Sequence, residues 1–255
     1  MSIQGIDVSH YQLNIDWGKV AASGIKFCIM KAMYESTHKP DEFFEKNYQG
    51  CVANGLRKGA YIFIGSRSIQ NPKEDAEDFL NILDGRTLEY GIWLDAESTK
   101  VAALGKQKIT EILLAEAEVF ERAKYHVGIY TNPNWYKNYL DISRLKDRYP
   151  FWVARYPAID TGVMSMFLSP KGYAEAWQYS SKGSVPGIKG NVDLDVDYTY
   201  DKFIIEYIQA EQVLAGKWGS ANTKPTRKER LEAAGYDYDA VQRKVNAIYK
   251  ARTSK

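Results

Sequence analysis

Short apolar segments alternate with stretches of helical periodicity over residues 5–140. The strand-like segments are GIDVS, FCIMKA, KGAYIFI, GIWLDAE and HVGIYT, and each is followed by a helical pattern. Strands that alternate with helices are typical of parallel sheets whose crossover connections are helical. The pattern therefore predicts an α/β fold built from five regular strand and helix units.

The helical segments carry recognisable start and stop signals. We expect one helix over residues 16–23, ended by Gly24, and a second over residues 41–54. A third should begin near Asn71, a good capping residue that precedes Pro72 at the first helical position. A fourth is indicated by one apolar stripe, made of Ile109, Ile112, Leu113, Ala117 and Phe120.

The pattern changes in the last third of the chain. FWVARY, EAWQYS and VDLDVDY are strand-like, but the segments between them contain Gly, Ser and Pro in place of helical periodicity. A barrel built from these strands should therefore be irregular at its end. After the polar stretch GSANTKPT, Val241, Val245 and Ile248 share a face with Tyr238, which predicts a separate small helical module.

Composition narrows the class of protein. The chain has 45% hydrophobic and 26% charged residues and a net charge of +2, as expected of a soluble globular protein that does not bind nucleic acid. The charge is uneven, because ten Lys and Arg face six Asp and Glu from Glu206 onward. Such a tail could favour an anionic polymer such as bacterial wall, or could be a solvated helix face.

Targeting signals and cysteines suggest a cytoplasmic site of synthesis. MSIQGIDVSHYQ lacks a charged start followed by an apolar stretch, so we expect no secretory signal. No run of 18 apolar residues is present, so we expect no membrane span. Cys28 and Cys51 lie in a strand-like run and a probable helix, and we interpret both as reduced core thiols.

Acidic residues follow the predicted strands. Asp7 follows GI, Asp95 and Glu97 follow GIWL, and Asp193 lies near the end of the last cycle. The carboxyl ends of parallel strands meet at one rim of a barrel, so these four acids should converge there. Residues two apart on a strand point to the same side, which makes Asp95 and Glu97 a close pair with one raised pKa. A protonated acid beside an ionised one suits glycosidic bond cleavage.

Other interpretations of these acids exist. An isolated Asp-x-Glu can be a solvated strand end. Asp193, Asp195 and Asp197 alternate, which makes a calcium site conceivable, but the glycine turn and terminal Glu of a calcium loop are missing. Three His without HExxH, and no GxSxG, P-loop or dinucleotide motif, argue against zinc, esterase, NTPase and dehydrogenase chemistry. We therefore expect neither a metal nor a cofactor.

Aromatic residues gather near the same strand ends. Flat rings with polar edges suit the apolar faces of sugars, and Gln178 and Arg155 could bind hydroxyls or a carboxylate. Any one aromatic on a strand can equally be core, so the cluster carries the argument. Its members are Tyr61, Phe63, Trp93, Tyr130, Trp152, Tyr156, Trp177 and Tyr179.

Three ordered motifs resemble the family 25 glycoside hydrolases, the lysozymes found in phage endolysins and some secreted muramidases: GIDVSHYQ, WLDAE and WQYSSKGSVPGIKGNVDLD. The resemblance covers residues 1–203 and implies a distorted, TIM-like (β/α)5β3 barrel. It implies hydrolysis, with retention, of the β-1,4 bond between N-acetylmuramic acid and N-acetylglucosamine.

By the same resemblance Glu97 is the proton donor, and Asp7, Asp95 and Asp193 line the site. Either a carboxylate or the substrate's own acetamido oxygen attacks the anomeric carbon. We favour the second route, with Asp95 or Asp193 orienting that group. Tyr130 and Trp177 are expected sugar contacts.

The tail resembles the short three-helix wall-binding repeat of phage lysins, through AEQVLAGKWG and RKERLEAAGYDYDAVQRKVN, with NTKPT inserted between them. We expect residues 204–209 to be a linker and residues 210–250 to bind peptidoglycan, with Trp218 and Arg227 as contacts. The chain should be a monomer or a weak homo-oligomer through this tail. Together these features suggest a phage endolysin that accumulates in the host cytoplasm and reaches the wall after release.

Two other functions compete with an active muramidase. A pseudoenzyme could keep the barrel and bind wall carbohydrate without cleaving it, but all four acids are present. A chitinase should carry the strand motif DxxDxDxE, which is absent.

Overall fold

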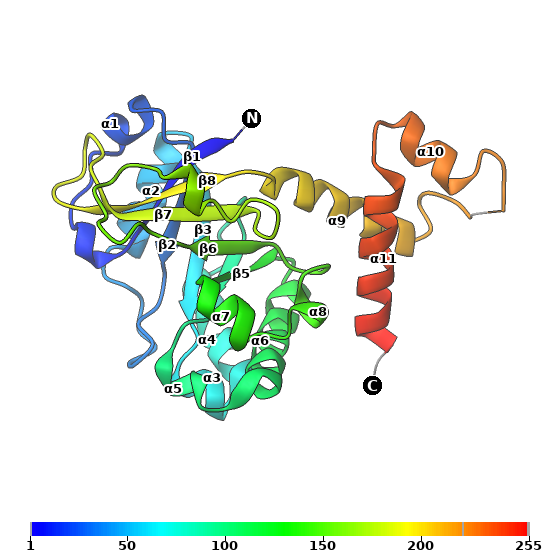
Figure 1. The fold of residues 1–255 in the computed structure, drawn as a ribbon, viewed down its shortest axis with the longest axis horizontal. Coiled ribbons are helices and arrows are strands. Elements are labelled where there is room, and N and C mark those ends of the chain that lie inside the picture. Colours follow the sequence, from blue (N-terminus) through cyan, green and yellow to red (C-terminus); the bar gives the residue numbers. More distant parts are fainter. Residues whose placement is uncertain (1, 221, 254–255) are drawn as a thin grey trace.

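Eight strands close into a barrel in sequence order (Figure 1). The computed structural model describes residues 2–220 and 222–253. Strands β1 to β7 pair in parallel, each with its neighbour, whereas β8 is antiparallel to both β7 and β1. The strands are β1 (Ile3–Val8), β2 (Phe27–Lys31), β3 (Arg57–Phe63), β4 (Ile92–Asp95), β5 (Val127–Thr131), β6 (Phe151–Ala154), β7 (Ala176–Gly183) and β8 (Val192–Asp197). The predicted irregular α/β barrel is confirmed, but its last strand is reversed.

Helices cover the outside of the first five strands. Asp16 caps α1 by accepting a hydrogen bond from Lys19 N at 3.2 Å, and Pro72 opens α4 as expected, although the Asn71 side chain makes no capping bond. The helices are α1 (Trp17–Ala22), α2 (Phe44–Ala53), α3 (Ser66–Gln70), α4 (Pro72–Leu83), α5 (Thr99–Ala102), α6 (Gly105–Arg122), α7 (Pro133–Asn138) and α8 (Ile142–Leu145), with 3-10 turns η1 (His10–Gln12) and η2 (Met166–Leu168). All five residues of the apolar stripe predicted in α6 are buried.

No α-helix connects β6 to β7. Residues 155–175 form an irregular segment with η2 as its helical turn, and β7 and β8 form a long hairpin (Figure 1). The outer face of the barrel is therefore less regularly covered here than beside β1 to β5.

Side chains of alternate residues fill the barrel, because successive residues of a strand point to opposite faces. Aromatic rings dominate the interior, and Gly128 makes room for one of them, since a Cβ there would lie 2.4 Å from the Trp93 ring. The buried interior cluster consists of Phe27, Ile29, Tyr90, Trp93, Tyr130, Trp152, Ala154, Ala176 and Tyr200. This packing fills the inside of the barrel. An active site can therefore lie only at the rim, where the parallel strands have their carboxyl ends.

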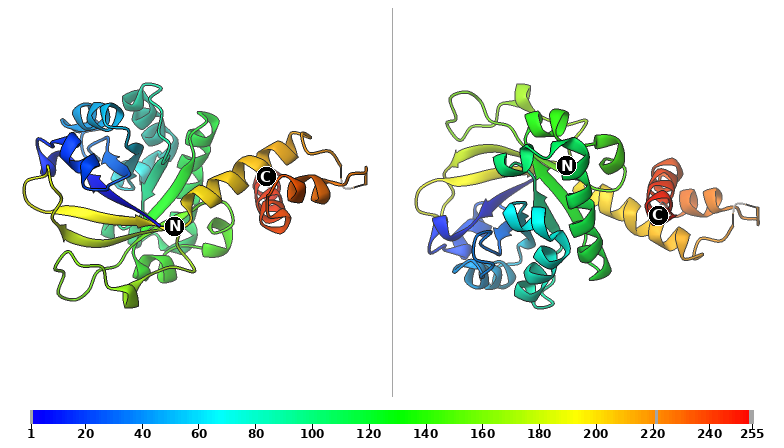
Figure 2. Two further views of the ribbon diagram at one scale, coloured as in Figure 1. Left: turned by 90° about the horizontal axis from the view of Figure 1, so that it is seen from above. Right: turned by 90° about the horizontal axis from the view of Figure 1, so that it is seen from below.

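Three further helices pack against one another beside the barrel (Figures 1 and 2). They are α9 (Tyr200–Leu214), α10 (Arg227–Ala233) and α11 (Tyr238–Thr253), and their shared core is Ala210, Val213, Leu231, Val241, Val245 and Ile248. The expected linker, residues 204–209, lies inside α9. One continuous helix therefore joins the barrel to the helical module.

The first residue of α9 also belongs to the barrel. The Tyr200 ring stacks on Tyr90 with centroids 4.6 Å apart, and Tyr200 N donates to Asp197 Oδ1 at 2.8 Å. Cys28 and Cys51 are both buried free thiols, as expected. Among the described residues, no helix combines the length and apolar character needed to cross a membrane.

Candidate active site

Asp95 and Glu97 lie on the same side of the chain at the end of β4. Ala96 between them keeps β4 extended beyond its last residue, because Ala96 N donates to Tyr130 O at 2.9 Å and Ala96 O accepts from Thr131 Oγ1 at 2.8 Å. Asn132 Nδ2 donates to Glu97 Oε2 at 3.4 Å. Strand β5 thus holds the backbone between the two carboxyls, and Asn132, which follows β5, bonds Glu97.

A second group of acids comes from β1 and β8. Asp7 lies opposite Asp193 in the antiparallel register, and Asp195 lies two residues further along β8. Asp193 was expected at the carboxyl end of a parallel strand; it instead lies near the start of a reversed strand, which brings it to the same rim. The predicted convergence of Asp7 and Asp193 therefore occurs, through a different topology.

Gln178 connects these acids to two tyrosines. Its Nε2 donates to Asp7 Oδ2 at 2.6 Å, and its Oε1 accepts from the hydroxyl of Tyr130 at 2.8 Å and from that of Tyr156. With its oxygen engaged by two donors, the amide can present only N–H to Asp7. Gln178 was predicted to bind substrate, and in this structure it orients Asp7 and the two rings.

Below the rim, Asp195 and Asp197 bind protein donors. Trp152 Nε1 donates to Asp195 Oδ1 at 2.8 Å, and Asp197 accepts from the hydroxyl of Tyr90. Among the described residues, no group of three or more His, Cys, Asp or Glu is arranged to hold a metal ion. The alternating aspartates of β8 thus run from the rim into the barrel, where Asp195 and Asp197 bind different aromatic donors.

Burial shifts the titration of every acid at the rim. The pKa values of Asp95 and Glu97 are raised, mainly by desolvation; the nearby charge of Glu97 raises the pKa of Asp95 further, whereas Asn132 partly lowers that of Glu97. Asp95 is 7% exposed, and its Oδ1 is buried without a hydrogen-bond partner. Glu97 is half-buried, so it is the more accessible proton donor.

The acids of β1 and β8 titrate together. Desolvation raises the pKa of Asp7, and the charges of Asp193 and Asp195 raise it further. Desolvation and the neighbouring Asp160 raise the pKa of Asp193 to about 6. Desolvation and the charge of Asp193 also raise the pKa of Asp195, whereas a hydrogen bond shared with Asp7 lowers it and raises that of Asp7. Neutral and ionised carboxyls therefore coexist at this rim near neutral pH, as acid and base chemistry requires.

The predicted aromatic contacts fall into two groups. Tyr61 and Phe63 are half-buried on the inward side of β3, where Phe63 is in register with Asp95. Tyr61 lies near the acids. Desolvation raises the pKa of Tyr61 most, and the charges of the acids raise it further. Tyr130 is 8% exposed and also lies on the inner side, so these three rings can border a substrate.

Trp152 and Trp177 are too deeply buried to border a substrate. Trp152 is 2% exposed beneath the rim, with its indole bound to Asp195. Trp177 is fully buried among residues outside the barrel, because its neighbour Gln178 points inward. Neither has free surface for a sugar, contrary to the prediction. Arg155 is half-buried and lies beside Tyr173, where its charge lowers the pKa of that tyrosine, itself raised by desolvation.

Sequence reasoning missed two residues of the site, Asn132 and Asp160, and gave other roles to two more, Tyr156 and Asp195. Asn132 bonds Glu97, Tyr156 bonds Gln178, and Asp195 adjoins Asp7. Asp160 is held by Ser180 Oγ at 2.6 Å and Ser181 N at 2.7 Å, and these bonds help lower its pKa. The Asn-Pro pair after β5 was a detectable signal for Asn132, since it marks a helix start at the rim.

Trp218 and Arg227 fix the loop between α9 and α10. Trp218 Nε1 donates to Gln212 Oε1 at 3.1 Å, and the Arg227 guanidinium donates twice to Gly219 O at 3.3 Å. Both side chains are half-buried. Their contact with wall stays a prediction.

Comparison with known proteins agrees with this geometry. Glycosyl hydrolases family 25 matches residues 6–188, and the CW_7 repeat matches residues 209–249. The autolytic lysozyme of Clostridium acetobutylicum is 29% identical over 193 residues, which cover 76% of this chain and 55% of that protein. Lysozyme M1 of Streptomyces globisporus is 32% identical over 202 residues, covering 75% of this chain and 66% of that protein. The chain thus spans between about half and two thirds of these relatives.

Solved structures show the same barrel. The bacterial lysozyme from Streptomyces coelicolor superimposes with a TM-score of 0.60 at 26% identity, covering 76% of this chain and 90% of that one. The CTP1L endolysin has a TM-score of 0.65 at 22% identity and covers 97% of this chain and 99% of that one, which shows a shared fold. The match to residues 6–188 includes the β4 carboxyl pair and Asp7. This chain belongs to glycosyl hydrolases family 25 and carries a CW_7 repeat after its barrel.

Proposed function

We propose that the protein is a muramidase that cleaves the β-1,4 bond between N-acetylmuramic acid and N-acetylglucosamine in peptidoglycan. The observation that carries this proposal is the extended Asp95–Ala96–Glu97 segment, which holds a reachable Glu97 beside a buried Asp95 and across the rim from Asp7 and Asp193. Family membership and the lysozyme relatives support the same reaction.

In this mechanism Glu97 donates its proton to the glycosidic oxygen. The acetamido oxygen of the substrate attacks the anomeric carbon as the leaving sugar departs, and water then opens the cyclic intermediate while Glu97 accepts a proton. Two displacements at one carbon give net retention. We assign orientation of the acetamido group to Asp193, because its pKa of about 6 leaves it largely ionised near neutral pH, whereas burial and the charge of Glu97 raise the pKa of Asp95 well above its usual range.

The competing mechanism uses an enzyme carboxylate as the nucleophile. De-N-acetylated glycan separates the two, because it lacks the acetamido oxygen. Substrate assistance predicts no cleavage of this glycan by the wild type, whereas a carboxylate nucleophile predicts continued cleavage with a covalent glycosyl-enzyme visible by mass spectrometry.

The CW_7 repeat supports a role for the helical module in holding the enzyme on peptidoglycan. We further propose an endolysin of phage origin, made in the host cytoplasm and active on the wall after release. Its support is the likeness to the fold of the CTP1L endolysin over 97% of the chain. A carbohydrate-binding protein without catalysis is the alternative.

The test of the activity is digestion of purified peptidoglycan, followed by borohydride reduction and mass spectrometry of the new sugar ends. Reduced muramic acid is expected. Reduced glucosamine would place the cut at the other bond, and an absence of new sugar ends would favour the binding protein.

A further inference from the structure

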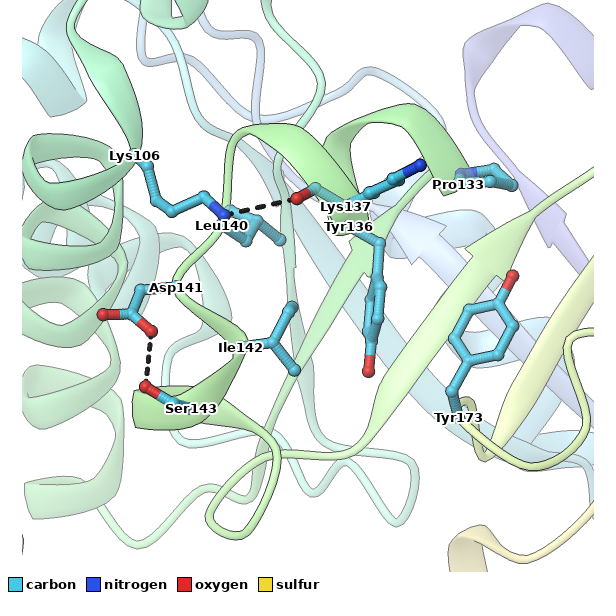
Figure 3. A pocket seen from close by; sticks show the side chains of 9 residues that line it. All are labelled: Lys106, Pro133, Tyr136, Lys137, Leu140, Asp141, Ile142, Ser143 and Tyr173. Atoms are coloured by element: carbon cyan, nitrogen blue, oxygen red, sulfur yellow. Dashed lines mark hydrogen bonds between the residues drawn. The ribbon is translucent and has the colours of Figure 1, made fainter.

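A hollow on the outside of the barrel is built from aromatic and aliphatic side chains. Its volume is about 550 Å³, and its walls come from α6, α7, α8 and the segment before β7 (Figure 3). Tyr136 and Tyr173 form one side, with ring centroids 4.8 Å apart at 53°. Pro133 and Ile142 supply the aliphatic surface, and Leu140, which also lines the hollow, is fully buried. The hollow lies where no helix follows β6, so the irregular segment 155–175 leaves part of the outer face open.

The edges of the hollow are charged. Lys106 Nζ donates to Lys137 O at 3.2 Å, and both lysine side chains are exposed. Asp141 also lines the hollow, but its carboxylate already accepts from Ser143 Oγ at 2.6 Å (Figure 3). The hollow is therefore bordered by two positive charges and one negative charge, which favours an anionic ligand with apolar parts.

The hollow adjoins the general acid through one short helix. Asn132 caps α7 by accepting from Trp135 N at 3.1 Å and donates to Glu97 with its other amide atom. The next residue, Pro133, lines the hollow. Helix α7 has six residues and is therefore about 9 Å long. A peptide of four or five residues spans up to about 13–18 Å when extended, so it can reach from the rim to the hollow.

We infer that this hollow binds the stem peptide of peptidoglycan, the branch carried by the lactyl group of muramic acid. Alanine methyl groups would lie against the tyrosine and aliphatic walls, and a peptide carboxylate would lie beside Lys106 and Lys137. The two tilted rings contact each other and offer no single open face for a sugar ring, which disfavours a second glycan site. This inference rests on the proposed function. It means that the catalytic barrel, and not only the helical module, binds the stem peptide.

The test compares one double variant with a matched control. Lys106→Glu with Lys137→Glu reverses both charges at the hollow. Lys108→Glu with Lys146→Glu makes the same charge change at exposed residues that do not line it. Both are assayed on intact peptidoglycan and on glycan strands freed of stem peptide by an amidase, after thermal melting confirms that each is folded.

We expect the hollow variant to lose about tenfold in kcat/KM on intact peptidoglycan, equivalent to one strong ionic contact, and to match the wild type on stripped glycan. The control should match the wild type on both. Equal losses on the two substrates, or no loss on either, would overturn the inference. A wild type that cleaves neither substrate defeats the proposed function instead.

A second measurement needs no catalysis. A free stem peptide carrying a photoreactive benzophenone is cross-linked to the full-length Glu97→Gln variant, and the cross-links are mapped by mass spectrometry. Cross-links within residues 133–143 or at Tyr173 support the hollow as the peptide site. Cross-links confined to residues 209–249 would assign peptide binding to the repeat and reject the hollow.

Discussion

Asp7 and Asp193 lie directly opposite each other in the register between β1 and the reversed strand β8. Their strands run in opposite directions, so a residue near the end of β1 meets a residue near the start of β8 at one rim. The arrangement brings two carboxyls together, and burial raises the pKa of both.

Replacement of Asp193 by Asn should remove the acidic limb of the pH profile. In the wild type, kcat/KM should fall as pH drops through about 6, where Asp193 becomes protonated and no longer orients the acetamido group as an anion. Asp193→Asn should lower kcat/KM at pH 7 about a hundredfold and lose this inflection. An inflection that persists near pH 6 in a folded variant would assign it to another group.

Replacement of Asn132 should shift the basic limb of the pH profile of kcat/KM. Asn132 donates to the carboxylate of Glu97 and so lowers its pKa against the larger effect of desolvation. Asn132→Asp keeps a good helix cap for α7 but replaces the donor by a negative charge, so the pKa of Glu97 should rise and activity should persist to higher pH.

Asn132→Ser serves as its control, because it caps the helix and adds no charge. Its basic limb should lie between those of the wild type and Asn132→Asp. Superimposable basic limbs in all three proteins would show that Glu97 is not the group that titrates there.

Much of this site follows from strand alternation in the sequence. Asp95 and Glu97 are two apart, and β5 holds them on one side as expected. The same alternation limits prediction at β7, because one of the adjacent residues Trp177 and Gln178 must face outward and the local sequence does not say which. Packing decides it: Gln178 binds Asp7, and Trp177 packs outside the barrel.

The direction of β8 was the main error in the fold. Parallel strands need a long crossover, whereas antiparallel neighbours can be joined by a short loop. Residues 184–191 are too few for a crossover helix, so this signal was present in the sequence. Contacts such as that between Asp160 and Ser180 join an irregular segment to β7 and have no periodic pattern from which to infer them.

Replacement of the buried Glu116 by Gln should stabilise the protein at high pH. Glu116 is fully buried in α6, both of its carboxyl oxygens are without hydrogen-bond partners, and burial followed by the charge of Asp75 raises its pKa. The folded state therefore holds a proton that the unfolded state releases above about pH 4.5, so Glu116 lowers stability as pH rises. Glu116→Gln removes this effect and should raise Tm at pH 8 by roughly 2–4 °C, the shift expected for about 1 kcal/mol.

The matched control for this prediction is Glu118→Gln, an exposed position on the same helix. Its melting temperature should follow the wild type at pH 5 and at pH 8. A Glu116→Gln protein that is no more stable at pH 8 than the wild type would show that folding does not raise the pKa of Glu116.

Two truncations should separate wall binding from barrel stability. A chain that ends at residue 215 keeps α9 and removes α10 and α11, so it should fold but sediment less with purified walls. A chain that ends at residue 199 also loses Tyr200, which stacks on Tyr90 inside the barrel. Its barrel should be destabilised by about 3–5 kcal/mol, the cost of deleting a large buried side chain. Unchanged sedimentation of the longer truncation would contradict a binding role for the module.

The most direct measurement of the central claim is the release of reduced muramic acid from purified peptidoglycan by the wild type and by Glu97→Gln. Glutamine keeps the shape and the hydrogen-bonding position of Glu97 but cannot donate the catalytic proton. The variant should melt like the wild type and release muramic ends at least about a hundredfold more slowly. A folded Glu97→Gln protein that releases them at the wild-type rate would contradict the assignment of Glu97 as the acid.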